Sequence, residues 1–149
     1  MRLTVLGCSG SMPGPDSPAS GYLVEADGVR LVLDLGNGAL GPLQQLVGVA
    51  GLAELDAVVL SHLHPDHCMD LCGLYVALRY GVPSARRIPV YGPDETAERM
   101  AAAYGKEPDP GLSGEFDFRP YPAAAFAVGP LMVRAVRVEH PVPAYAVRV

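Results

Sequence analysis

The chain has 149 residues, 50% of them hydrophobic, and a formal net charge of −5 at pH 7. This length is enough for one domain with a sizeable core, and we expect a single domain over residues 1–149. Proteins whose main partner is a long nucleic acid carry a basic stripe, whereas the only adjacent basic pair here is Arg86-Arg87. Extensive nucleic-acid binding is therefore not expected. No apolar run approaches the roughly 20 residues of a membrane helix, so no membrane span is predicted.

Cysteine usage indicates the redox compartment. Cys8, Cys68 and Cys72 are an odd number of thiols in a chain whose first residues do not form a secretory signal. We therefore expect reduced thiols and a cytoplasmic location. Cys68 and Cys72 are four residues apart on a predicted helix; packing against the sheet is favoured over a metal or redox pair.

Hydrophobic runs bounded by Gly and Pro predict alternating strands and helices. The predicted helices cover 40–49, 69–80 and 95–104, and the predicted strands cover 3–6, 21–26, 29–33, 55–60, 88–91, 116–118, 126–128, 131–138 and 144–149. Asp27-Gly28 is a typical hairpin turn between the second and third strands. A strand-rich chain with interleaved helices predicts an α/β or α+β fold with a mixed sheet.

Residues 61–67, Ser-His-Leu-His-Pro-Asp-His, contain three of the four histidines and follow the predicted buried strand 55–60. Open α/β sheets place their ligands at the carboxyl ends of strands. Imidazole and carboxylate are the usual donors to zinc, iron or manganese. We therefore favour a metal site over a polar surface loop.

The spacing within this loop indicates two binding directions. His62 and His64 are two residues apart, so in an extended segment they point to the same side and can share one metal ion. Asp66 and His67 leave the backbone in another direction and could serve a second ion. Such a paired centre holds its ions roughly 3.5–4 Å apart.

Two further residues end predicted strands. A lone histidine is more often structural than a ligand, but His140 would give the first metal a third nitrogen and leave a position open for water. That is the pattern of catalytic zinc. Asp34 either caps the segment that follows it or hydrogen-bonds a metal-ligating histidine from behind; from spacing alone, capping is the favoured interpretation.

The motif His-x-His-x-Asp-His, formed by His62, His64, Asp66 and His67, resembles the signature of the metallo-β-lactamase superfamily. His140, in Val-Glu-His-Pro-Val, is similar to the third ligand of that family's first metal. The resemblance extends to Gly7-Cys8-Ser9-Gly10-Ser11 with Pro15 and to Ser20-Gly21-Tyr22-Leu23, as in the ribonuclease Z-like branch, and to Leu33-Asp34-Leu35-Gly36, which resembles the strand-end Asp-x-Gly. Within that branch the chain is most similar to bacterial hydrolases of small cyclic phosphodiesters, including cyclic-nucleotide phosphodiesterases.

The resemblance implies an αββα sandwich, of which this chain covers about the first half. It implies two divalent metal ions, with zinc expected and manganese or iron as alternatives. His62, His64 and His140 would hold one ion, and Asp66 and His67 would hold part of the other, whose bridging Asp and last His lie in the family's second half.

Two further roles follow from the resemblance. Asp66 would be catalytic, orienting or deprotonating the attacking hydroxide, and Asp34 would support a ligating histidine from behind. We expect the functional protein to extend beyond Val149.

The implied reaction is hydrolysis of a small phosphodiester by a metal-activated water. Processing of tRNA 3′ ends, thioester hydrolysis and lactam or lactone opening are alternatives, of which the acidic charge disfavours the first. A rival from another class is a non-catalytic metal-binding fragment that needs a partner or its missing half. The mean hydropathy of +0.22 fits a half sandwich with one exposed apolar sheet face, which predicts poor solubility or a homodimer.

Overall fold

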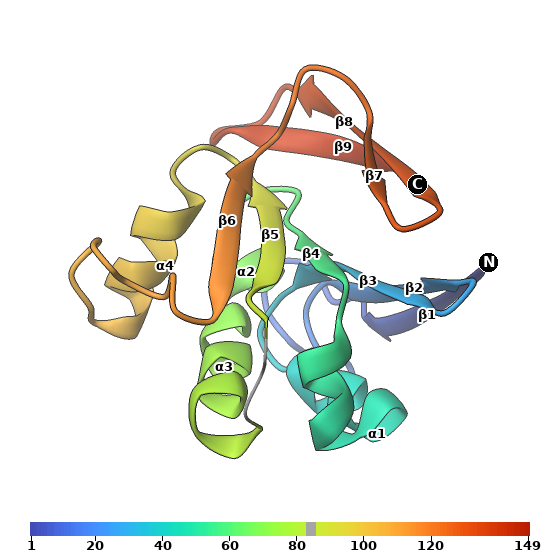
Figure 1. The fold of residues 1–149 in the computed structure, drawn as a ribbon. Helices are drawn as coiled ribbons and strands as arrows, with labels where there is room; N and C mark the ends of the chain where they lie inside the picture. Colours follow the sequence, from blue (N-terminus) through green and yellow to red (C-terminus); the bar gives the residue numbers. More distant parts are fainter. Residues whose placement is uncertain (83–85) are drawn as a thin grey trace.

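The computed structural model describes residues 1–82 and 86–149 as a layer of helices and two stacked β-sheets (Figure 1). The larger sheet contains, in spatial as well as chain order, β1 (Arg2–Gly7), β2 (Gly21–Ala26), β3 (Val29–Leu35), β4 (Ala57–Val59), β5 (Ile88–Gly92) and β6 (Phe116–Pro120). The smaller sheet contains β7 (Phe126–Val128), β8 (Leu131–Val138) and β9 (Ala144–Arg148). The α/β prediction is confirmed, and every predicted strand is present within two or three residues of its expected ends.

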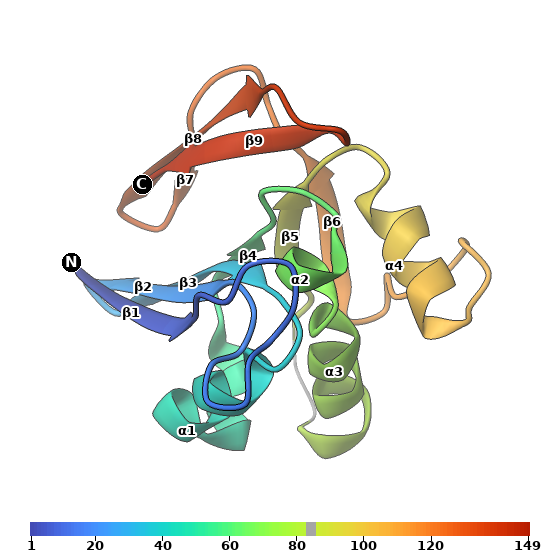
Figure 2. The ribbon, with the colours of Figure 1, turned by 180° about the vertical axis from the view of Figure 1, so that it is seen from behind.

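The larger sheet is mixed. Strands β1, β2 and β3 pair antiparallel, and the β2–β3 turn has positive φ at Asp27 and Gly28. Strands β3, β4, β5 and β6 pair parallel, and each parallel step needs a crossover. Helices fill these crossovers on one face of the sheet, while the smaller sheet covers the other face (Figure 2). The carboxyl ends of β3 and β4 therefore lie side by side; Asp34 is the second-last residue of β3, and the histidine loop follows β4.

The helices are α1 (Leu40–Gly51), α2 (Pro65–Cys68), α3 (Leu71–Val76) and α4 (Thr96–Tyr104), with short turns η1 (Leu52–Glu54) and η2 (Ala77–Gly81). The single helix predicted over 69–80 is wrong in one respect, because it is interrupted at Asp70. The Asp70 N–H donates to Leu35 O at 3.0 Å, and the carbonyl of Asp66, its helical partner, accepts from Ser20 N at 3.1 Å. Tertiary hydrogen bonds thus replace one helical bond. Pro65 starts α2 earlier, since proline suits a first helical turn.

The core has two parts, one on each face of the larger sheet. On β4, Val58 packs toward the helices with Leu43 and Leu74, whereas Ala57 and Val59 pack toward the smaller sheet. This alternation follows from the two-residue period of a strand. Strand β4 is apolar on both faces because layers cover it on both sides.

The outer face of the smaller sheet is uncovered. Met132, Val136 and Val138 are 57%, 51% and 43% exposed on this face, which also carries exposed Arg134 and Arg148. Within the described ranges 1–82 and 86–149, no helix has the length and apolar character needed to cross a membrane.

Candidate metal centre

The histidine loop leaves β4 in a fixed direction because its backbone is bonded on both sides. Leu60 N donates to Tyr91 O at 2.8 Å, and Ser61 O accepts from Tyr145 N of β9 at 2.9 Å. The chain is still extended at His64, with φ −70° and ψ 146°, before Pro65 begins α2. As the spacing predicts, His62 and His64 therefore reach the same region.

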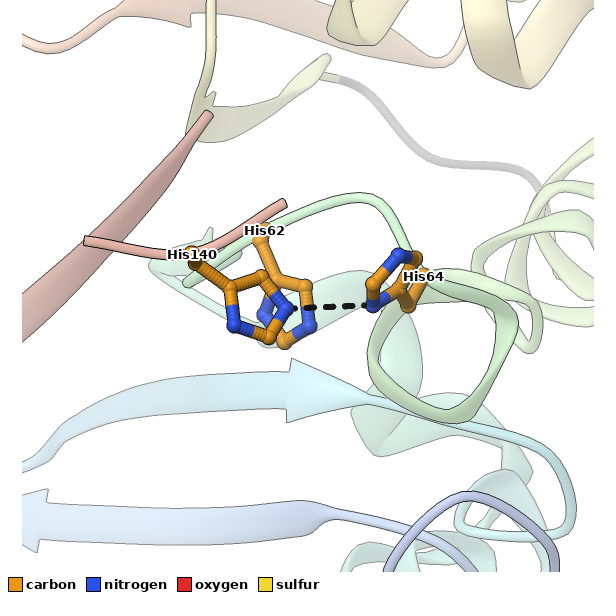
Figure 3. A group of neighbouring side chains, drawn as sticks. All are labelled: His62, His64 and His140. Carbon is orange, nitrogen blue, oxygen red and sulfur yellow. Dashed lines mark hydrogen bonds between the residues drawn. The ribbon is translucent and has the colours of Figure 1, made fainter. Parts of the chain in front are cut away.

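Three histidines converge from the two sheets. His62 and His64 come from the loop after β4, and His140 comes from the loop after β8 (Figure 3). One nitrogen of each ring lies within 4.8 Å of the other two, and His140 Nε2 is 3.3 Å from His64 Nδ1. His62 is buried, His64 is half-buried and His140 is exposed, so the cluster opens to solvent on the side of His140.

Hydrogen bonding assigns the nitrogen that His62 offers. Ser61 Oγ donates its one proton to Asp34 Oδ2 at 2.8 Å and lies 3.0 Å from His62 Nδ1. The hydroxyl oxygen therefore accepts from Nδ1–H of His62, which leaves Nε2 with its lone pair free. Tetrahedral zinc with bonds of 2.0–2.1 Å sets its nitrogens about 3.3 Å apart. The His64–His140 spacing matches that value, so these rings could hold a metal ion.

Asp66 and His67 form a second group beside the three histidines. In their side chains, Asp66 Oδ2 and His67 Nε2 are 3.4 Å apart, and the His62 and His67 ring centroids are 4.0 Å apart. The opposite nitrogen of His67, Nδ1, lies 2.7 Å from Asp34 Oδ2. A carboxylate behind an imidazole fixes the tautomer and ring orientation of a metal ligand, so His67 Nε2 and Asp66 could serve a second ion.

The favoured capping interpretation of Asp34 is wrong. The Leu40 N–H at the start of α1 is bonded instead by Asp70 Oδ2 at 2.9 Å. Asp34 is buried and faces the site, where Oδ1 accepts from Ser61 N at 2.6 Å and Oδ2 accepts from Ser61 Oγ and His67 Nδ1. Its φ of 55° turns the chain sharply at the end of β3.

Asp66 is held from two further segments. The backbone N–H of Ser11, in the loop after β1, donates to Asp66 Oδ2 at 2.9 Å. A Cβ added at Gly36 would lie 1.9 Å from the Asp66 carbonyl oxygen, so only glycine lets the chain after β3 pass this close. The small-residue loop thus binds the carboxylate of Asp66, and the strand-end glycine leaves room for its backbone carbonyl.

The protonation of the site follows from burial and from these bonds. Burial, aided by the nearby His67, lowers the pKa of His62 to about 4, so the ring is neutral at pH 7. Burial alone would lower the pKa of His67, but the hydrogen bond and charge of Asp34 outweigh it and raise that pKa. Burial alone would raise the pKa of Asp66, but the Ser11 amide and the neighbouring imidazoles lower it.

The cysteines pack rather than join the cluster. Cys68 is buried and its thiol donates to His64 O at 3.3 Å, while burial raises its pKa to about 12. Cys72 is half-buried against the helix-side core, and all three thiols are free.

The sequence alone did not single out Ser61 or Gly36 as functional. The available signal for Ser61 was its position directly before His-x-His.

Comparison with known proteins identifies the class. Residues 17–147 match the family described as the Beta-lactamase superfamily domain, and the chain belongs to this family. It is 46% identical over 156 residues to the uncharacterized protein ML1173 of Mycobacterium leprae, covering 100% of this chain and 53% of that protein. It is 32% identical over 152 residues to the probable metallo-hydrolase YhfI of Bacillus subtilis, covering 100% of this chain and 59% of that protein. The chain thus spans little more than half the length of these relatives.

Solved structures show the same fold. The crystal structure of YhfI from Bacillus subtilis, described as a metallo-β-lactamase fold protein, superposes with a TM-score of 0.79 at 31% identity over 98% of this chain and 56% of that chain. Human tRNase Z, short form, superposes with a TM-score of 0.71 at 19% identity, over 97% of this chain and 63% of that chain. The expected metallo-β-lactamase fold is confirmed.

Proposed function

We propose that this chain contributes the metal centre of a metal-dependent hydrolase acting on small, cyclic phosphodiesters. The observation that carries the proposal is the convergence of three imidazoles from two sheets beside a carboxylate–imidazole pair. The similarity to a protein named a probable metallo-hydrolase supports the general class.

The donor set fits a paired metal site. His62, His64 and His140 would hold one divalent ion, with zinc expected and manganese or iron as alternatives, because imidazole suits zinc and iron and the neighbouring carboxylate suits manganese. Asp66 and His67 would contribute to a second ion. Bound ions would supply Lewis-acid stabilisation of the phosphate and a lower pKa for the attacking water.

The residues of the chain prepare this site for proton transfer and binding. Asp66 is a carboxylate at pH 7 because its pKa is lowered, so it can accept a hydrogen bond from an attacking water and orient it. The Ser11 amide fixes the side chain in that position. Asp34 holds His67 by its Nδ1, which directs Nε2 toward Asp66. Substrate would approach over exposed His140.

The charge of the chain supports a small substrate. A net charge of −5 disfavours a long polyanion, so we propose a small phosphodiester as the partner. The three free thiols support the proposed cytoplasmic location. Ribonuclease Z of Mycolicibacterium paratuberculosis is 34% identical over 104 residues, covering 68% of this chain and 36% of that protein. This similarity keeps tRNA 3′-end processing as the second candidate.

A third candidate is a metal-binding fragment that becomes active only with further sequence or a second copy of the chain. The chain spans about half of its relatives, and the outer face of the smaller sheet carries exposed apolar side chains. A homodimer that covers this face would be detected by analytical ultracentrifugation.

The test is hydrolysis of cyclic AMP, of a chromogenic phosphodiester and of precursor tRNA by the zinc- or manganese-loaded chain. We expect turnover of the small diesters, at least 100-fold reduced in His64→Ala, with the fold retained by circular dichroism. Glu139→Ala, an exposed change beside His140, is the control and keeps wild-type turnover. Cleavage of precursor tRNA alone would favour the second candidate, and metal uptake without any turnover would favour the third.

A further inference from the structure

The metal centre draws its ligands from two different sheets. His62 and His64 follow β4 of the larger sheet, whereas His140 follows β8 of the smaller sheet. The distance between His140 and the other two rings therefore depends on how the sheets are held together at this end. The backbone bond from Tyr145 N to Ser61 O provides one connection.

Tyr121 provides a second connection from a third segment. It lies between β6 and β7, where the chain passes from the larger to the smaller sheet (Figure 1). Its hydroxyl donates to the carbonyl oxygen of Leu60 at 2.8 Å. Leu60 is fully buried and is the second residue before His62. This bond therefore fixes the peptide from which the histidine loop departs.

The ring of Tyr121 reaches the strand that follows His140. Its centroid is 4.6 Å from that of Tyr145, with an angle of 51° between the planes. Tyr145 is the second residue of β9, and its N–H is the donor to Ser61 O. Tyr121 thus makes two contacts near the histidine loop. Its hydroxyl binds the backbone just before His62, and its ring contacts Tyr145, whose N–H binds the same loop.

The hydroxyl of Tyr121 is also a permanent donor. Burial raises its pKa above the usual value for tyrosine, so the proton remains on the oxygen at neutral pH. A buried carbonyl that loses such a donor has no water to replace it. Removal of this one oxygen would therefore loosen the Leu60–Ser61 peptide while leaving the ring packing in place.

We propose that Tyr121 is a positioning residue of the metal centre, which sets the spacing of His140 against His62 and His64 through Leu60 and Tyr145. The inference rests on the metal site of the proposed function. It assigns Tyr121 no contact with metal or substrate.

Tyr91 offers a matched control in the same layer. Its ring is 7% exposed and stacks on Phe126 at 4.2 Å between the two sheets. Its hydroxyl accepts a hydrogen bond from Arg119 Nη1 at 2.8 Å. Tyr91→Phe therefore removes a tyrosine hydroxyl and one hydrogen bond, but its partner Arg119 belongs to β6 of the same sheet rather than to the histidine loop.

The experiment compares metal binding by the full chain and by Tyr121→Phe and Tyr91→Phe. Cobalt(II) is titrated into metal-free protein, its visible d–d absorption is recorded, and zinc affinity is measured by competition with a chromophoric chelator. We expect Tyr121→Phe to weaken metal affinity roughly 10-fold, as for residues that support ligands, and to shift the d–d bands. Tyr91→Phe keeps the wild-type spectrum and an affinity within about twofold, although each variant loses one hydrogen bond of a tyrosine hydroxyl.

Each outcome separates this inference from the function it rests on. Equal affinity and identical spectra for Tyr121→Phe and Tyr91→Phe would overturn the role of Tyr121 while leaving the metal site intact. No cobalt uptake by the wild-type chain would refute the metal site itself. If Tyr121→Phe does not fold, Tyr145→Ala decides instead, because it removes the ring contact but keeps the backbone donor; an unchanged cobalt spectrum in that variant would refute the proposal.

Discussion

Replacing Asp34 by Asn removes one charge at the point where β3 meets the histidine loop. The carboxylate accepts from Ser61 N, Ser61 Oγ and His67 Nδ1 at 2.6, 2.8 and 2.7 Å. Hydrogen bonds to charged groups contribute about 1.5–3 kcal/mol each. The amide of Asn can still accept from Ser61 N, but its NH₂ then faces donors. We therefore expect the free energy of unfolding of the metal-free protein to fall by about 3 kcal/mol, the loss of one to two such bonds.

The loss should depend on pH with a definite sign. The hydrogen bond and charge of Asp34 outweigh the effect of burial and raise the pKa of His67 above 6.5. The stabilisation from protonated His67 is thus complete below pH 6.5 and disappears as pH rises through the raised native pKa. Asp34→Asn should therefore be most destabilising below pH 6.5 and less so in alkaline solution, where only the neutral hydrogen bonds are lost.

Urea denaturation in EDTA at several pH values measures this effect. Asp27→Asn is the matched control, because Asp27 also has positive φ, 49° against 55° for Asp34, but lies on an exposed hairpin turn. Asn tolerates such a φ, so backbone strain is not a confounding factor. The control should change stability by less than about 0.5 kcal/mol. Equal effects of the two substitutions, or a loss for Asp34→Asn that grows with pH, would refute the assigned role of Asp34.

Three further predictions concern glycine, pH and thiols. Gly36→Ala, whose Cβ would lie 1.9 Å from Asp66 O, should destabilise the protein by about 3 kcal/mol as an overpacked site and weaken metal binding. Gly41→Ala, in α1 with nothing within 4 Å, should not destabilise it and should leave zinc binding unchanged in the same urea and zinc titrations. The pKa of His62 falls from 6.5 to about 4 on folding. Between pH 7 and pH 5, the free energy of unfolding of the metal-free wild type should therefore fall by about 2 kcal/mol more than that of His62→Gln. Equal decreases in the two proteins would contradict this. Exposed Cys8 should react quickly with a disulfide reagent at pH 8, and buried Cys68, whose pKa is about 12, should react only in denaturant; peptide mapping that finds both labelled at the same rate would contradict the assigned burial.

The sequence predicted the fold well because its signals are local. Apolar runs such as 55–60 and turn residues such as Asp27-Gly28 each determine one element, and these elements form as expected. The prediction failed where tertiary bonds override local preference. The interruption of the helix at Asp70 arises from its bond to Leu35 O, 35 residues earlier in the chain, and helical periodicity carries no information about that bond.

The candidate site shows the same division. His62 and His64 share a direction because they are two positions apart in an extended segment, and the structure brings their rings together as this spacing predicts. Two other contacts depend on which strands become neighbours. Asp34 binds His67 instead of capping a helix, and Tyr121 binds Leu60, which lies 61 positions earlier in the chain. Ser61 was visible beside the histidines, but its hydroxyl becomes informative only once Asp34 is known to lie behind it.

Metal content of the purified chain after dialysis, measured by elemental analysis, tests the central claim most directly. His62, His64 and His140 place nitrogens within 4.8 Å of one another, so the account predicts at least one divalent ion per chain in the wild type, with Asp66 and His67 raising occupancy toward two at excess metal. His140→Ala should lose the retained ion while the helices and sheets remain. A wild type that holds no more metal than His140→Ala would contradict the account.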